Sequence, residues 1–414
     1  MKIELILIMK DVPTFATWPI WDEEDINLVT EVIKSGKWWC GAPKAHEGEN
    51  VWKFQEEFAD FHQAKHAFAC TNGTHAIEIC LMALGIGRGD EVIVSDWTFV
   101  ASASAVASVG AVPILCDVNE DTFLIEPSKI EELLTHRTKA IVCVHLGGMP
   151  CDMEALLKIA KTHDLKIIED CAHAHGSSLQ NKMVGTWGDC GTFSFQASKV
   201  INAGEGGAII CNDDDLALKI YQVLDSGRLP GRWFYDHFAY GSDFRLGEMN
   251  AALLRTQLKK YPAQFQLRNK NAHYLNTKLK EIPGISPQKR KKAVTGCANY
   301  VYPVFFDPDH FGGIDYKVMY KELEERGIPT DACYPPLHKL DLFQNMNLLP
   351  NIDYSQANWG KDNTHPQNFP VVEKLHRNAF QLDQRVLLSN QEALDYIVEQ
   401  IKIIQKKFSK DDME

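Results

Sequence analysis

The pattern of apolar and polar positions predicts an alternation of helices and short strands over the first half of the chain. Residues 22–36 and 49–63 carry acidic residues near their start and an apolar stripe, which predicts two helices. From residue 66 onward, short apolar runs alternate with segments of helical spacing, as in βαβ units that build a largely parallel sheet. The expected strand segments are residues 66–73, 90–100, 112–118, 139–148 and 165–176, and the expected helices between them are residues 74–86, 101–110 and 152–164.

The pattern changes near residue 261. A long helix is expected over residues 262–282, followed by an apolar segment at 299–306 and further helices at 315–328 and 392–408, which suggests a second, smaller α/β domain. Residues 345–370 are long and irregular, and we interpret them as a functional loop or a partly disordered segment. We expect three parts: an N-terminal segment (1–40) that packs on the C-terminal domain, a large domain (41–260) and a small domain (261–414).

Composition and charge exclude several classes of protein. The 414 residues are 45% apolar, which is ample for a large core, and the net charge of −12 argues against sequence-blind binding of nucleic acid. We interpret the basic run at residues 289–292 as a solvated loop. The apolar run at residues 5–9 is too short to span a membrane, so a soluble, cytoplasmic protein is expected.

The cysteines argue against disulfides and against a zinc site. There are 11 of them, without any C-x-x-C pair, which fits free buried thiols in a reducing compartment. His173 and His175 lie close to Cys171, but no second cluster at matching spacing completes four ligands, so we expect no metal.

A single lysine, Lys199, follows a strand-like run that contains Ser194 and precedes a glycine-rich turn. Such a lysine is either a solvated loop residue or a nucleophile, and a lysine amine attacks carbonyls only when a pocket holds it neutral or as an imine. Pyridoxal 5′-phosphate (PLP) is the cofactor that uses such an amine. It also needs a carboxylate at its ring nitrogen, a stacking platform and a phosphate cradle at the start of a helix.

The chain offers a candidate for each part, always at the end of an expected strand, where ligands of parallel sheets gather. Asp170 is the candidate carboxylate, Trp97 or Phe99 the platform, and Gly73, Thr74 and Ser194 the phosphate cradle. Taken alone, each residue also has an ordinary structural interpretation: Asp170 and Thr74 as helix caps, Phe99 as core, Lys199 as a solvated side chain. Their combination favours a PLP site.

The motifs "EDCAHAHGS" and "GTWGDCGTFSFQASKVINAGEGGAII" resemble the DegT/DnrJ/StrS aminotransferases, PLP enzymes that aminate ketosugars and ketocyclitols. The resemblance covers nearly the whole chain, with "CTNGTHAIEICLMALGIGRGDEVIV", "FRLGEMNAALLRTQL" and "GIPTDACYPPLH" in the expected order. It implies PLP-dependent transferase fold type I, with a mostly parallel seven-stranded sheet in the large domain. It also implies a homodimer whose active sites lie at the subunit interface.

Specific roles follow from the same resemblance. It implies that Lys199 is the Schiff-base lysine and that Asp170 pairs with the pyridine nitrogen. It places His173 near the phenolic oxygen of the ring, and Phe99 rather than Trp97 at the stacking position. The residues that it implies for the phosphate are Gly73, Thr74 and Ser194.

One position departs from the family pattern. Asp243 stands where the family usually has an asparagine that reaches the partner subunit's phosphate, and an ionised aspartate would repel that dianion. Three explanations are open: Asp243 is turned away, Arg245 compensates its charge, or it is protonated.

The presence of Lys199 favours amino transfer, from glutamate or glutamine to a ketocyclitol or a free or nucleotide-linked ketosugar. The alternatives are a PLP-dependent sugar dehydratase or lyase and a non-catalytic PLP-binding regulatory protein. For the latter, the sequence shows neither a DNA-binding helix-turn-helix nor a basic face.

Overall fold

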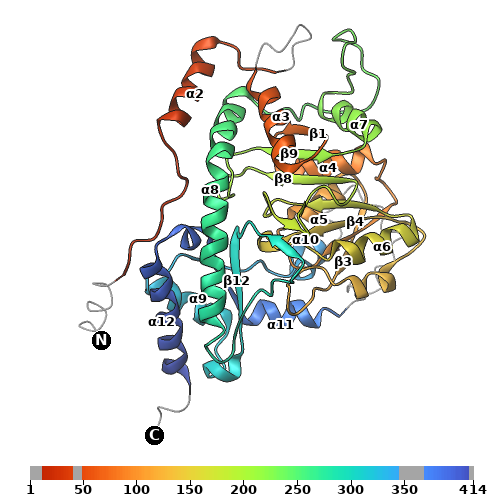
Figure 1. Ribbon diagram of the computed structural model, residues 1–414. Helices are drawn as coiled ribbons and strands as arrows, with labels where there is room; N and C mark the ends of the chain where they lie inside the picture. The colour runs from red at the N-terminus through yellow and green to blue at the C-terminus, as the bar shows by residue number, and fades with distance from the viewer. Residues whose placement is uncertain (1–11, 41–48, 345–367, 410–414) are drawn as a thin grey trace.

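The computed structural model describes residues 12–40, 49–344 and 368–409. The apolar run at 5–9 and most of the irregular segment at 345–370 lie outside these residues. A seven-stranded sheet forms the large domain, in the order β1-β9-β8-β5-β4-β2-β3 (Figure 1). The strands are β1 (His66–Cys70), β2 (Glu91–Ser95), β3 (Val112–Cys116), β4 (Thr138–Val144), β5 (Lys166–Asp170), β8 (Cys190–Ser194) and β9 (Gly207–Cys211). Only β9 runs antiparallel to its neighbours, so the predicted mostly parallel sheet is confirmed.

Both faces of this sheet are buried. Alternate residues of β9 enter different cores: Ile209 belongs to a cluster shared with α4 and α7, and Ile210 to a cluster shared with α3 and α8. This alternation follows from the two-residue period of a strand and explains why β9 is apolar throughout. The helices around the sheet are α3 (Asn50–His62), α4 (Gly73–Ala83), α5 (Ala101–Ser108), α6 (Met153–His163), α7 (Asp214–Leu224) and α8 (Glu248–Leu279).

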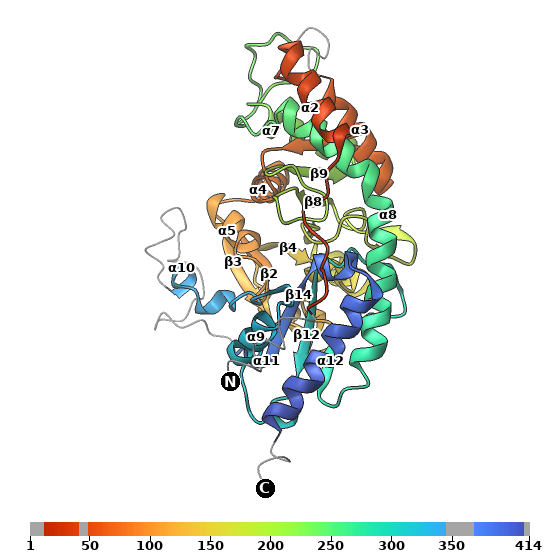
Figure 2. The same cartoon turned by 90° about the vertical axis from the view of Figure 1, so that its left-hand side faces the viewer.

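A smaller antiparallel sheet forms the second domain, in the order β10-β12-β14-β13 (Figure 2). Its core is shared with the C-terminal half of α8 and with α12. The elements are β10 (Ile285–Pro287), β12 (Val301–Phe306), β13 (Thr330–Asp331), β14 (Ala379–Asp383), α9 (Tyr316–Glu325), α10 (Asp341–Gln344), α11 (Pro370–Asn378) and α12 (Gln391–Phe408). A further three-stranded sheet is formed by β6 (Ser178–Leu179), β7 (Lys182–Met183) and β11 (Val294–Gly296).

The long helix α8 differs from the sequence expectation. We expected a helix to begin at residue 262, but α8 starts at Glu248 and continues through Pro262. An internal proline costs about 3 kcal/mol or more. Tertiary packing offsets this cost, because Tyr261 is fully buried and donates a hydrogen bond to the carbonyl of His175 at 2.7 Å. The helix therefore crosses the expected domain boundary and contributes to the cores of both domains.

The N-terminal segment runs along both domains (Figure 2). Phe15 packs against the small-domain core, and the backbone N–H of Ala16 donates to Ser389 Oγ at 3.0 Å. Helix α2 (Glu23–Ser35) then packs on α8, where Asp25 accepts a hydrogen bond from Gln257 Nε2 at 3.0 Å.

All 11 cysteines are free and buried, which confirms that expectation. The basic run lies between β10 and β11, where exposed Lys289 and Lys291 pair with Asp121 and Asp152. Among the described residues, none of the helices combines the length and the apolar character that a membrane span requires.

Candidate active site

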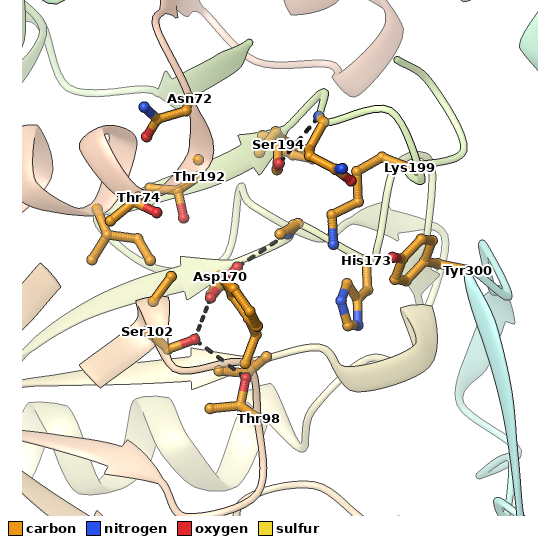
Figure 3. Close-up of a pocket in the computed structure, with 18 of the residues that line it drawn as sticks. Asn72, Thr74, Thr98, Ser102, Asp170, His173, Thr192, Ser194, Lys199 and Tyr300 are labelled. Atoms are coloured by element: carbon orange, nitrogen blue, oxygen red, sulfur yellow. Dashed lines mark hydrogen bonds between the residues drawn. The ribbon is translucent and has the colours of Figure 1, made fainter. Parts of the chain in front are cut away.

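A cavity of about 600 Å³ lies beyond the carboxyl ends of β5 and β8, between the two domains (Figure 3). All seven residues that the sequence suggested for cofactor binding line it: Gly73, Thr74, Phe99, Asp170, His173, Ser194 and Lys199. Trp97, the alternative platform, does not line it. Its ring is buried, and its Nε1 donates to the carbonyl of Tyr334 at 2.8 Å.

One end of the cavity is the N-terminus of α4. Asn72 caps this helix by accepting a hydrogen bond from the backbone N–H of His75 at 2.8 Å, which leaves the N–H groups of Gly73 and Thr74 at the helix start. A Cβ on Gly73 would lie 2.8 Å from Ser194 Cβ, so this close approach requires glycine. Free N–H groups at a helix start, with the Ser194 hydroxyl beside them, form an anion cradle.

Asp170 ends β5 and is 6% exposed. Ser102 Oγ donates a hydrogen bond to Asp170 Oδ2 at 2.7 Å, and the backbone N–H of Ala172 donates to Oδ1 at 3.1 Å. Ser102 in turn lies 3.2 Å from Thr98 Oγ1 (Figure 3). These contacts fix the orientation of the carboxylate in the cavity, and they offset part of the cost of burying it.

Lys199 lies on the turn that follows β8 and is 9% exposed. Burial lowers the pKa of its amine to about 8, against the opposing charge of Asp170. Its Nζ points into the cavity and lies 4.1 Å from the centroid of the Tyr300 ring (Figure 3). The structure therefore excludes the solvated-loop interpretation of this lysine.

His173 is held as a neutral ring. Its pKa is lowered well below the ordinary value, mainly by burial and also by the charge of Lys199. The backbone N–H of Gly147 lies 3.3 Å from Nδ1, so Nδ1 accepts and the proton is assigned to Nε2, which faces Tyr334 Oη at 3.3 Å.

Several lining residues carried no sequence signal of their own. Tyr300 and Tyr334 come from the small domain, and only the folded chain brings them to Lys199. Ser102 lies on α5, where small residues predict only close helix packing. Phe99 is 52% exposed, and its ring lies 5.9 Å from that of Tyr334.

Asp243 is not among the residues that line the cavity. Its carboxylate pairs with Arg245 Nη2 at 2.7 Å, and Arg245 also pairs with the buried Asp225. Of the three explanations for an aspartate here, the geometry supports charge compensation by Arg245.

His145, Glu169 and Cys171 bring three possible metal-binding atoms together in the buried part of the described chain. Glu169 Oε1 accepts hydrogen bonds from the backbone N–H groups of Trp187 and Gly188, both at 2.7 Å, and Oε2 lies 3.0 Å from His145 Nε2. Both oxygens of the Glu169 carboxylate thus have hydrogen-bond partners, and those of Oε1 hold the segment after β7 in place. A structural role is sufficient to explain why this carboxylate is buried.

Comparison with known proteins agrees with this geometry. Residues 19–402 match the sequence profile of the DegT/DnrJ/EryC1/StrS aminotransferase family. The L-glutamine:2-deoxy-scyllo-inosose aminotransferase of Streptomyces fradiae is 34% identical over 390 residues, 91% of each chain. The GDP-perosamine synthase of Caulobacter vibrioides is 45% identical over 213 residues, 51% of this chain and 57% of that protein.

The crystal structure of 3-amino-5-hydroxybenzoic acid synthase superposes with a TM-score of 0.86 and 30% identity, covering 96% of this chain and 100% of the other. The profile match spans both domains and every residue that lines the cavity. This chain therefore belongs to the DegT/DnrJ/EryC1/StrS aminotransferase family.

Proposed function

We propose that this aminotransferase uses PLP, bound in the cavity around Lys199, to move an amino group from glutamine or glutamate to a keto group on a polyhydroxylated ring. The single observation that carries the proposal is the buried amine of Lys199, which shares one cavity with the carboxylate of Asp170 and the start of α4. A solvated lysine would not have its pKa lowered to about 8.

The residues present fit PLP. The N–H groups at the start of α4 and the Ser194 hydroxyl suit a phosphate dianion, and the missing Cβ of Gly73 lets Ser194 lie close to the start of the helix. Asp170 suits a protonated ring nitrogen, and the half-exposed Phe99 offers an aromatic face. His173 presents a neutral polar ring in the same cavity.

When bound, PLP supplies an electron sink for the bond changes at the carbon that bears the amino group. Lys199 then moves the proton, because an amine with a pKa of about 8 is neutral in about one molecule in ten at pH 7, far more often than an ordinary lysine. Ser102 and the backbone of Ala172 hold the Asp170 carboxylate in place throughout. The small-domain residues Tyr300 and Tyr334 cover the cavity and limit the access of water.

The nature of the two substrates rests on the relatives. The Streptomyces fradiae relative is named for glutamine and an inosose, and the shorter match is named for a GDP-linked amino sugar. The cavity is lined by the carboxylates of Asp170 and Glu205 and by a single lysine, Lys199. Among the described residues of the cavity, little positive charge is available for a diphosphate, which favours a free ring such as a ketocyclitol.

We also propose that the chain works as a homodimer in the reducing cytoplasm, in line with its free thiols. Large aromatic side chains are exposed at the end of the N-terminal segment and on the large domain, a feature typical of interfaces. They are Trp38, Trp39, Trp233, Tyr235, Phe238 and Tyr240, with exposures from 41% to 83%. We expect analytical ultracentrifugation to give a mass twice that of the monomer.

The function is tested by incubating the purified, PLP-loaded protein with glutamine or glutamate alone. Formation of pyridoxamine phosphate, detected by mass spectrometry, supports amino transfer, whereas a lyase or dehydratase leaves the cofactor unchanged. A panel of ketoinositols and nucleotide-linked ketosugars then identifies the acceptor. Absence of pyridoxamine phosphate with both donors would contradict the proposal, and a regulatory protein would bind PLP without turnover.

The reactivity of Lys199 is expected to rise with pH through about 8, rather than near the usual lysine value of 10.5. The neutral amine is the reactive form, and burial favours it, so the fraction that attacks an aldehyde grows as pH rises through the lowered pKa. The measurement is the initial rate of borohydride-trapped PLP on Lys199 at pH values on both sides of 8. A midpoint near 10.5 would show an amine exposed to water.

Gly73→Ala is expected to weaken binding of the cofactor by at least about tenfold. The added Cβ would lie 2.8 Å from Ser194 Cβ and would push apart the two sides of the anion cradle. Fluorescence titration of PLP measures the effect. The matched control is Gly247→Ala at the N-cap of α8, where the nearest atom is 3.8 Å away. Equal affinities for both variants would place the phosphate elsewhere.

A further inference from the structure

The aromatic ring of Tyr300 closes one side of the cavity over the Lys199 amine. Tyr300 directly precedes β12 of the small domain, and its ring centroid lies 4.1 Å from Lys199 Nζ (Figure 3). This distance is well within the range of about 6 Å for attraction between a cation and the electron-rich face of an aromatic ring. The contact thus joins the reactive turn of the large domain to the small domain.

Hydrogen bonds keep the ring in this position. Tyr300 Oη lies 2.7 Å from the Oγ of Ser198, the residue before Lys199. The carbonyl of the same Ser198 accepts a hydrogen bond from Gln384 Nε2, and Gln384 Oε1 accepts one from the fully buried Arg268 at 2.6 Å. The Tyr300 ring also packs against the ring of His173, with centroids 4.3 Å apart. The hydrogen bond to Ser198 and the contact with His173 together fix the ring over the amine.

Apart from Tyr300, few groups around Lys199 stabilise the positive charge of its ammonium form. The titratable groups that face the amine are Asp170, His173 and His175 beyond β5, Tyr300 and Tyr334 of the small domain, and Glu205 on the turn after Lys199. Both histidines are buried and neutral, and Glu205 is exposed to water. Asp170 is the one buried carboxylate among these groups, and in the proposed function it serves the cofactor nitrogen.

We propose that Tyr300 is a positioning residue whose ring face holds the ammonium form of Lys199, so that a buried amine can accept a proton and keep it within the cavity. The catalytic meaning of this role rests on the proposed function, because only a lysine that exchanges protons with substrate needs both charge states. The contact itself belongs to the chain alone and is measurable without cofactor.

The test compares Tyr300→Leu with Tyr300→Phe in the full-length chain without bound PLP. The measurement is the pH midpoint of Lys199 acylation by acetic anhydride, read by mass spectrometry of the Lys199 peptide. Phenylalanine keeps the ring face and loses only the hydroxyl, whereas leucine removes the face but stays apolar. Ser198→Ala is a further control, since it removes the partner of the hydroxyl and leaves the ring.

We expect Tyr300→Leu to lower the midpoint by about 0.5–1 pH unit, a three- to tenfold change in proton affinity. Tyr300→Phe and Ser198→Ala should stay close to the wild type. The direction in which the midpoint shifts distinguishes this role from mere exclusion of water. If Tyr300 only excluded water, its loss would hydrate the amine and raise the midpoint. An unchanged or raised midpoint in Tyr300→Leu would overturn the proposal.

A second series keeps the test valid if Tyr300→Leu does not fold. Phenylalanine analogues with one, two and three ring fluorines at position 300 preserve the shape but weaken the negative face of the ring. The midpoint should fall stepwise with fluorination, and a constant midpoint would contradict the role of the ring. If wild-type Lys199 titrates as expected but never forms a borohydride-trapped adduct with PLP, the proposed function fails while this inference stands.

Discussion

Lys199→Ala is expected to reduce amino transfer by at least about 10²–10⁴-fold, the range for loss of a general base, and to abolish the covalent attachment of PLP. Among the residues that the structure describes, no other lysine lines the cavity, and Lys199 is buried with its Nζ directed into it. The other basic side chain among the described lining residues, His173, cannot replace Lys199, because an imidazole has no primary amine to form the link with the cofactor. The measurements are steady-state transamination and the cofactor absorption band.

The matched control is Lys161→Ala, which removes an exposed lysine of α6 remote from the cavity. It should retain wild-type turnover and the same borohydride-trapped peptide. Substantial turnover in Lys199→Ala, with an intact absorption band, would refute the assignment of the reactive amine. Added methylamine offers a further check, because a small amine that enters the cavity should restore part of the lost rate.

Asp170→Asn is expected to lower turnover by about 10²–10³-fold, the range for loss of one preorganised electrostatic contact, while the fold is retained. Asparagine has nearly the same shape and still accepts at Oδ1 from the backbone N–H of Ala172, so the local structure should survive. What is lost is the negative charge that would keep the cofactor nitrogen protonated. The measurements are turnover and the PLP spectrum.

Two further variants serve as comparisons for Asp170→Asn. Asp164→Asn changes an exposed aspartate at the end of α6, with φ of 53°, a conformation that asparagine tolerates well, and should leave activity unchanged. Ser102→Ala removes one hydrogen bond to Asp170 Oδ2 and should cost no more than about tenfold. If Asp170→Asn kept full turnover, the carboxylate would serve only as a structural cap.

The candidate active site depends on both domains because the turn that carries Lys199 lies where they meet. Ser198 and Lys199 follow β8 of the large sheet, yet their partners Tyr300 and Gln384 belong to the small domain. Helix α8 makes this arrangement rigid, since it packs into the cores of both domains without a break. Substitutions that weaken the contact between the domains are therefore expected to displace Lys199, even when the substituted residue does not contact it.

The sequence by itself was sufficient for the parts of the site that depend on local pattern. Asp170 and Lys199 were predictable because each follows a short apolar strand, and the ends of parallel strands meet at one edge of a sheet. Gly73 and Thr74 were predictable because a polar turn before a helical segment marks a helix start. The mostly parallel sheet followed from the alternation of strand and helix patterns.

Only the tertiary structure decided what depends on contacts between residues distant in the chain. Tyr300 reaches Lys199 across 101 positions of sequence, and Ser102 reaches Asp170 across 68. The residues alone left Trp97 and Phe99 open, the family resemblance chose Phe99, and the burial of Trp97 against Tyr334 agrees with that choice. The helix continues through Pro262 because packing outweighs the lost hydrogen bond. Hydrophobic spacing encodes which face of an element is buried, but not which distant side chain will cover it.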